Sequence, residues 1–162
     1  MQIELKLEDV VVARVALNRL FRESHPKKAR DTFKLAKFQR RIDPVLEDYG
    51  KAHTELLEKY ACADPDTPGR FQFWKKDEDG EPVTDDKTKQ PITDPEAIEL
   101  FEKEHGDLLE EIVRLDIEGG LVLTFFERIG LEPPMSPAEM AALYWLINDF
   151  KDGLDESADE DQ

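Results

Sequence analysis

An apolar repeat between residues 27 and 60 constrains the fold more than any other feature of the sequence. Its members follow one another in steps of three and four residues, which places them along one side of a long helix. This apolar seam consists of Leu35, Phe38, Ile42, Val45, Tyr49, Ala52 and Leu56. A narrow seam is typical of a helix that packs against a second helix. Pro44 lacks a backbone donor, but the seam keeps its phase beyond it, so we expect a kink near residues 40–43 and not an end.

A second helix with a matching seam is predicted to begin at Asp94-Pro95. Its apolar side carries Ile98, Phe101, His105, Leu108 and Ile112. Around Val113, Leu115 and Ile117 the pattern alternates, which predicts a strand that could pair with residues 2–7. The two seams predict an antiparallel helical hairpin, which further helices must cover.

The remaining helices flank this hairpin in sequence. "QIELKL" alternates and predicts a short strand, and residues 8–21 predict a helix with Val11, Val15 and Leu20 among its apolar positions. "LVLTFFERIG" predicts a short apolar helix. Residues 136–150 predict a helix that starts with a capping box, with Met140, Leu143, Tyr144 and Ile147 facing the core and Trp145 facing outward.

Residues 61–93 predict a β-hairpin insertion. "RFQFW" alternates, "DEDG" carries a turn signal, and "PVT" predicts the returning strand. Phe71 and Phe73 share one strand face and Trp74 lies on the other, so Trp74 is predicted to be free for a partner. Alternatively, all three aromatic residues simply pin the hairpin to the surface.

The predicted fold class is mainly α (α+β). We expect an antiparallel helical hairpin or bundle with a short N-terminal strand, the β-hairpin insertion and a disordered acidic C-terminal tail. Residues 1–150 are predicted to form a single helical domain, and residues 151–162 a flexible tail. The tail either keeps the chain soluble or acts as an anionic arm that competes for a basic surface.

The composition restricts the classes of partner. The net charge of −16 over 162 residues argues against general binding to nucleic acid or anionic lipid, and allows a basic protein partner or nucleic-acid mimicry. No apolar run approaches the ~20 residues of a membrane span. The single cysteine, Cys62, and the acidic residues near the start predict a cytoplasmic protein without a secretion signal.

Motifs for catalysis are lacking: the sequence has no Gly-rich phosphate loop, cysteine pair, HExxH or GxSxG. We therefore predict no catalytic residue, no metal site and no cofactor. His53 and His105 fall at similar heights in the predicted helical hairpin and could meet near Tyr49. The preferred interpretation is a hydrogen-bonded core histidine with an unrelated neighbour, because a metal site would need further ligands.

A basic stripe at the start of the long helix consists of Lys27, Arg30, Lys34, Lys37 and Arg41, and acidic residues line the later helix. The stripe either pairs with Glu104 and Glu111 of the later helix or faces a phosphate or an acidic partner. The candidate partner-binding residues are Trp74, Lys27, Arg30, Lys34, Lys37, Arg41, Glu99, Glu102 and Asp107.

The stretches "FKLAKFQRRIDPVLEDYGKAHTELLEKY" and "MSPAEMAALYWLI" resemble a family of small acidic proteins encoded by phages and prophages, to which no function is assigned. The resemblance implies a helical fold and carries over no functional residue. We expect a non-enzymatic protein-binding module that acts on a host or phage protein, such as a counter-defence or host-takeover factor. The alternative is a phage assembly or structural accessory protein, such as a virion component or tail chaperone. The oligomeric state stays open.

Overall fold

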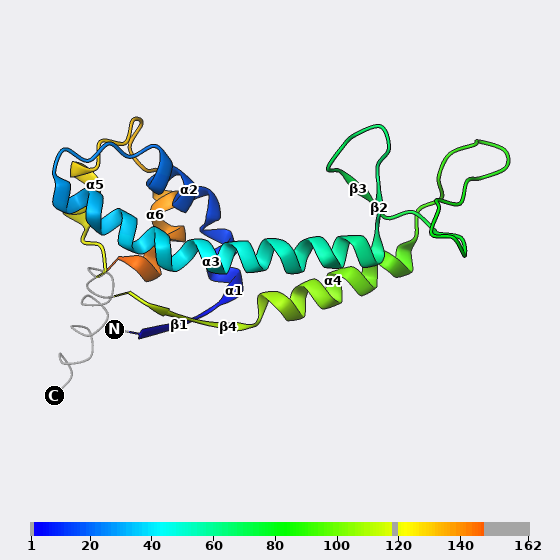
Figure 1. Ribbon diagram of the computed structural model, residues 1–162, viewed down its shortest axis with the longest axis horizontal. Coiled ribbons are helices and arrows are strands. Elements are labelled where there is room, and N and C mark those ends of the chain that lie inside the picture. Colours follow the sequence, from blue (N-terminus) through cyan, green and yellow to red (C-terminus); the bar gives the residue numbers. More distant parts are fainter. Residues whose placement is uncertain (1, 118–119, 148–162) are drawn as a thin grey trace, which may run out of the picture. The chain divides into compact units, whose positions relative to one another are not determined.

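The computed structural model describes residues 2–117 and 120–147 (Figure 1). The described part of the chain is mainly α with some β, which confirms the predicted fold class. It divides into a terminal unit, drawn from residues 1–46 and 112–162, and a central unit, Glu47–Glu111. The expected single domain covers both units, and the expected tail lies outside the described residues.

The terminal unit contains a two-stranded antiparallel sheet of β1 (Gln2–Lys6) and β4 (Ile112–Asp116). This pairing was predicted and is confirmed. Leu5 and Leu115 are buried in the core, and Glu4 lies opposite Arg114, whose Nε is 2.8 Å from the Glu4 carboxylate. The alternation of the two segments therefore places apolar side chains inward and an ion pair outward.

Two short helices replace the single helix expected over residues 8–21. They are α1 (Leu7–Val12) and α2 (Arg14–Arg22), which meet at Ala13. Leu17 and Leu20 are fully buried, whereas Val15 is 71% exposed. The break at Ala13 changes the helical phase, so Val15 leaves the apolar side on which it was expected.

The long helix α3 (Ala29–Tyr60) continues through Pro44, as predicted. In the terminal unit its seam residues Leu35, Phe38 and Ile42 are buried in one core cluster with Phe125 of α5 (Leu123–Arg128). Burying each such side chain contributes about 1.5–3 kcal/mol, so the first half of α3 is held by this core.

The helix expected over residues 136–150 is shorter than predicted. The capping box of Ser136 and Glu139 is present, but α6 spans only Pro137–Ala142, and a 3₁₀ turn follows at Tyr144–Leu146. Leu121 donates to the Leu146 carbonyl at 2.8 Å and bridges to Ile147. Because Leu146 and Ile147 pair with Leu121, the chain does not continue as an α-helix to these residues.

The shortened helix reverses two predicted orientations. Trp145, expected to face outward, is only 3% exposed, and Tyr144, expected inside, is 51% exposed. Leu143 and Ile147 are buried, as expected. The early helix end rotates residues 144 and 145 relative to a continuous α-helix, and this rotation brings the indole into the core.

An ion pair joins α2 to α6. Nη1 of Arg19 lies 2.9 Å from both carboxylate oxygens of Glu139. Glu139 also accepts from the Ser136 backbone at 2.7 Å. The Ser136 N–H first and the Arg19 guanidinium second lower the pKa of Glu139 below its usual value.

The central unit contains α3 from Glu47 onward and α4 (Pro95–Leu109), whose first turn is capped by Asp94. The two helices run side by side in opposite directions, as the seams predicted (Figure 1). Ile112, the expected end of the second seam, instead lies in β4 and is 59% exposed.

The insertion between these helices is paired differently from the prediction. "RFQFW" contributes β3 (Phe71–Gln72), which pairs with β2 (Cys62–Ala63) and not with "PVT". The predicted Asp-Gly turn is present between Asp77 and Gly80, and it closes a separate hairpin marked by the Lys76–Pro82 bridge. The sequence identified the turn but not the partner of the aromatic strand.

Replacing Ile42 tests the core of the terminal unit. Ile42 is completely buried, so Ile42→Asp forces a charge into apolar surroundings and is expected to lower the free energy of unfolding by roughly 3–5 kcal/mol. Ala36→Asp, an exposed position on the same helix, is the control, and its effect should stay within about 0.5 kcal/mol. Equal chemical-denaturation midpoints for the two variants would contradict the packing.

The Glu139 contacts predict a pH-dependent stabilisation. Because the folded-state pKa lies below the usual 4.5, the ionised carboxylate stabilises the fold above that value, and this contribution is lost as the pH falls through the folded-state pKa. Glu139→Gln should therefore cost about 1–2 kcal/mol at pH 7 and progressively less in acid. Glu23→Gln, which alters the exposed second partner of Arg19, should show little change in thermal melts at either pH.

Candidate protein-binding surfaces

The residues of the predicted basic stripe differ in exposure and in contacts. Lys27 and Arg30 are exposed, and Lys27 precedes α3. Lys34 is half-buried, with its Nζ 5.8 Å from the centre of the Phe125 ring, and burial lowers the pKa of its ammonium group. Arg41 lies 3.3 Å from Asp116 of β4. Lys34 and Arg41 therefore make contacts within the terminal unit.

Two residues of the expected pairing between the stripe and α4 bind other partners. Arg41 binds the strand residue Asp116, while Glu104 of α4 binds Lys59, with Nζ–Oε1 at 2.7 Å. The Lys59 ammonium first and the Tyr60 hydroxyl second lower the pKa of Glu104. Helical spacing alone cannot identify the partner, because several cations of α3 share a similar side of the helix.

The outward part of the stripe surrounds an exposed aromatic ring. Phe33 is 74% exposed, and side chains three and four residues apart on a helix are neighbours. We call this surface the Phe33 face; it consists of Arg30, Phe33, Ala36, Lys37 and Arg40. The sequence interpretation did not include Phe33. Phe33 lies two residues before Leu35, about 200° around the helix, and this offset could have revealed it.

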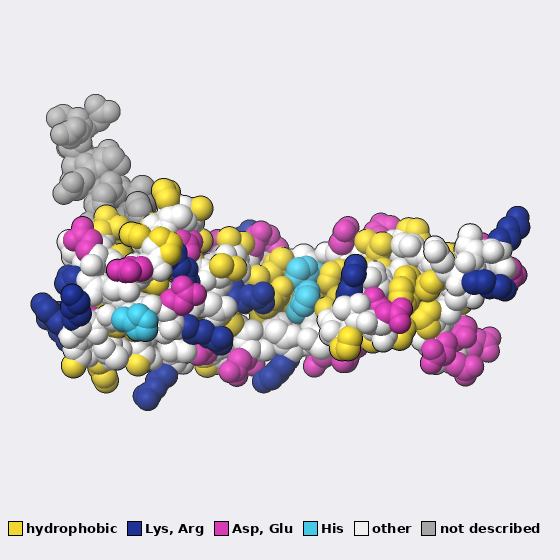
Figure 2. Space-filling view, turned by 90° about the horizontal axis from the view of Figure 1, so that it is seen from above, with side chains coloured by type: hydrophobic (Ala, Val, Ile, Leu, Met, Phe, Trp, Pro, Cys, Tyr) yellow, Lys and Arg dark blue, Asp and Glu magenta, His cyan; other side chains and the backbone are white. Residues whose placement is uncertain are grey.

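The Phe33 face combines positive charge with an apolar contact point. Phe33, Ala36, Lys37, Arg40 and Arg41 line a shallow depression of about 250 Å³. Arg30 and Arg40 form no ion pair with another residue of the described ranges. Lys and Arg side chains gather where α3 begins (Figure 2). Aromatic and guanidinium groups together are typical of the energetic centres of protein interfaces.

An ion pair with a buried carboxylate lies at the start of α3. The Asp31 side chain is only 6% exposed, and one of its carboxylate oxygens lies 3.5 Å from Nη2 of Arg128. The Arg128 guanidinium also lies 6.0 Å from the Phe125 ring centre. Because a buried carboxylate without a partner is strongly unfavourable, the pair orients this turn of the helix. The sequence interpretation missed this pair.

The two histidines of the helical hairpin meet in the central unit. The ring centres of His53 and His105 are 5.1 Å apart, and Nε2 of His105 is 3.0 Å from the Tyr49 hydroxyl. Phe101 stacks on His105 at 5.4 Å. The two rings therefore meet, and His105 is hydrogen-bonded as expected, but both histidines are half-buried and neither belongs to the core. Across residues 2–117 and 120–147, no three His, Cys, Asp or Glu side chains are grouped to hold a metal ion.

The other candidate residues are spread over the central unit. Trp74 is half-buried; its backbone N–H donates to the Gln72 carbonyl at 3.0 Å, and the residue bridges to Thr93. Glu99, Glu102 and Asp107 are exposed on α4. None of these residues is brought together with the Phe33 face in one unit.

Comparisons with known proteins identify no relative. No protein-family model matches the chain, and neither a curated protein sequence nor a solved structure is significantly similar to it. Within the described ranges, no helix has both the length and the apolar character needed to cross a bilayer. Function must therefore be inferred from the surfaces of this chain.

Removing the Tyr49 hydroxyl tests the histidine cluster. Tyr49→Phe leaves the half-buried His105 ring without its 3.0 Å hydrogen bond, so thermal unfolding at pH 7 should show a loss of about 1 kcal/mol. The control is Tyr144→Phe, at an exposed tyrosine, which should leave the stability unchanged. A similar loss of stability in both variants would show that the Tyr49–His105 hydrogen bond does not stabilise the fold.

Proposed function

We propose that this chain is a non-enzymatic protein-binding module, and that the Phe33 face contacts its partner. The partner would be a host or phage protein, and the binding would serve counter-defence or host takeover. The observation that carries the proposal is the 74% exposure of Phe33 between basic residues. A phage origin rests on the sequence resemblance.

The exposure of Phe33 has no structural benefit for the free chain. An exposed phenylalanine keeps apolar area in water that association would remove, at about 25 cal/mol per Å². Ala36 beside it is small, so a partner side chain can reach the ring and the helix backbone together. This combination supports a docking role for the ring.

The flanking charges predict the chemistry of the partner. Arg30 and Arg40 present guanidinium groups that bind carboxylates in two-pronged geometry. Although the whole chain has a net charge of −16, charges farther away than ~8–10 Å are screened at physiological salt. The local sign therefore determines the contact, and we expect the partner to offer carboxylates around an apolar residue.

Photo-crosslinking at position 33 tests the proposal. With p-benzoylphenylalanine at position 33, exposure to light in lysate of phage-infected bacterial cells should give a discrete adduct with a protein whose contact surface is acidic. The matched control carries the same residue at position 15, because Val15 is 71% exposed on α2. Arg40→Glu added to the position-33 probe should lower the adduct yield about tenfold, since it reverses a contact charge.

A charge control separates docking from general electrostatics. Arg22→Glu makes the same charge change on the exposed end of α2 and should leave the adduct unchanged. Equal adducts from positions 15 and 33, or equal losses in the two charge variants, would contradict the proposal. An adduct made only with virion proteins would instead favour the assembly role.

A further inference from the structure

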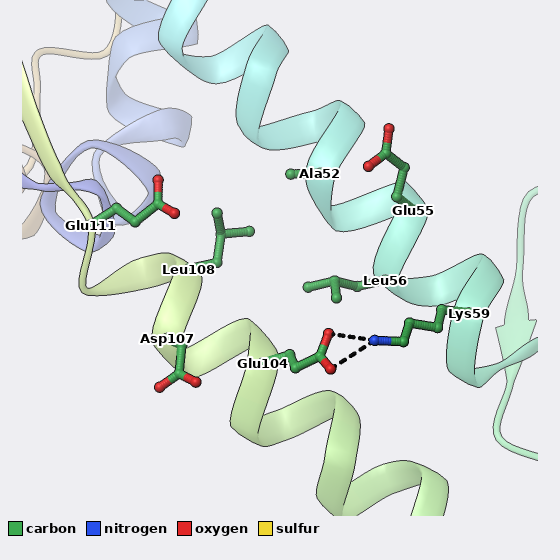
Figure 3. Close-up of a pocket in the computed structure, with 8 residues that line it drawn as sticks. All are labelled: Ala52, Glu55, Leu56, Lys59, Glu104, Asp107, Leu108 and Glu111. Carbon is green, nitrogen blue, oxygen red and sulfur yellow. Dashed lines mark hydrogen bonds and ion pairs between the residues drawn. The ribbon is translucent and has the colours of Figure 1, made fainter.

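A groove with an apolar floor runs between α3 and α4 in the central unit. Its volume is about 400 Å³. Leu56 of α3 and Leu108 of α4 point toward one another across it, and Ala52 widens it on the α3 side (Figure 3). These three side chains are half-buried. α3 and α4 therefore expose a strip of aliphatic side chains along the groove.

Acidic side chains border this floor on both helices. Glu55 lies on the α3 side, Asp107 on the α4 side, and Glu111 beyond the last turn of α4 (Figure 3). Among the residues that the structure describes, none forms an ion pair with these three carboxylates. The border is therefore negative and uncompensated.

The ion pair of Lys59 and Glu104 closes one end of the groove. Its Nζ–Oε1 distance is 2.7 Å (Figure 3). Among the described residues that line the groove, Lys59 is the only basic one, and its charge is matched by Glu104. Glu55, Asp107 and Glu111 can therefore bind a cation from outside the chain.

The position of these acids is unfavourable for the helix itself. A helix C-terminus carries partial negative charge and is stabilised by Lys or Arg in the last turn. The last turn of α4 contains no basic residue and contains Asp107, with Glu111 just beyond. Helix stability does not explain this arrangement, whereas binding of a cationic ligand does.

We propose that the groove binds a basic, amphipathic segment of a partner protein, with aliphatic side chains on the Leu56–Leu108 floor and Lys or Arg side chains on the acidic border. Helix-in-groove recognition uses this combination of an apolar strip and a charged border. The open groove accommodates a few side chains, as such a segment requires. This site is separate from the Phe33 face, and the proposal does not depend on that face.

A designed peptide tests the groove. The probe is a fluorescein-labelled peptide of about 14 residues with Leu three and four positions apart and Lys elsewhere, so that one helical side is apolar. Fluorescence anisotropy on the full chain should show saturable binding. Glu55→Lys combined with Asp107→Lys should weaken binding at least about tenfold. Because Asp107→Lys places a cation near the C-terminus of α4, thermal melting should show no loss of stability.

Matched controls separate the groove from the overall charge. Glu47→Lys combined with Glu102→Lys makes the same charge change at exposed positions of the same helices, outside the groove, and should alter affinity less than about twofold. A peptide with every Leu replaced by Ser should bind much more weakly. Phe33→Ser should leave peptide binding intact, so that failure of one surface is distinguishable from failure of the other.

Three results would overturn the proposal. If the groove double variant and the control double variant bind the peptide equally weakly, overall charge alone attracts the peptide. If the Leu peptide and the Ser peptide bind with equal affinity, the peptide does not contact the apolar floor of the groove. If sedimentation shows that the chain alone self-associates and that the peptide disrupts the complex, the groove belongs to a second copy of the chain and not to a partner protein.

Discussion

The apolar seam of α3 is the constraint on which both units depend. The helix is 32 residues long, and most helices of this kind are stable through packing of one side, since propensity alone is insufficient. Ile42 and its neighbours enter the core of the terminal unit, while Tyr49 and the residues after it pack in the central unit. One periodic pattern therefore determines which side of α3 is buried in each unit and which side remains available.

Because the seam determines what is buried, the exposed residues of α3 can differ along its length. The first half presents Phe33 with cationic neighbours, and the second half presents Glu55 beside Leu56. Each surface combines apolar atoms with one sign of charge. A chain with a large net charge can thus hold two local surfaces of opposite sign, because salt limits the range over which charges act.

Local patterns in the sequence predicted the elements better than the contacts between them. The continuation of α3 past Pro44 followed from the unbroken seam, and the pairing of the strand after α4 with the first strand followed from alternation. Trp145 was placed wrongly because the Leu121–Leu146 hydrogen bond ends the helix, and no local pattern encodes a bond between residues so far apart.

The candidate surfaces show the same limit. Phe33 was detectable, since it lies far from Leu35 around the helix, yet the basic stripe was interpreted without it. The groove required two facing helices, so Asp107 had no visible relation to Glu55 in the sequence. The Asp31–Arg128 pair likewise joins segments that only the folded chain brings together.

The chain has two tryptophans, and the fold places one in each unit: Trp145 in the terminal core and Trp74 in the central insertion. Their emission spectra consequently report on separate parts of the molecule. With Trp74→Phe, fluorescence follows the terminal unit alone, and with Trp145→Phe it follows the central unit. Coincident transitions in denaturant would mean that the shared helix makes the two units one cooperative domain, and separate transitions would mean that each melts independently.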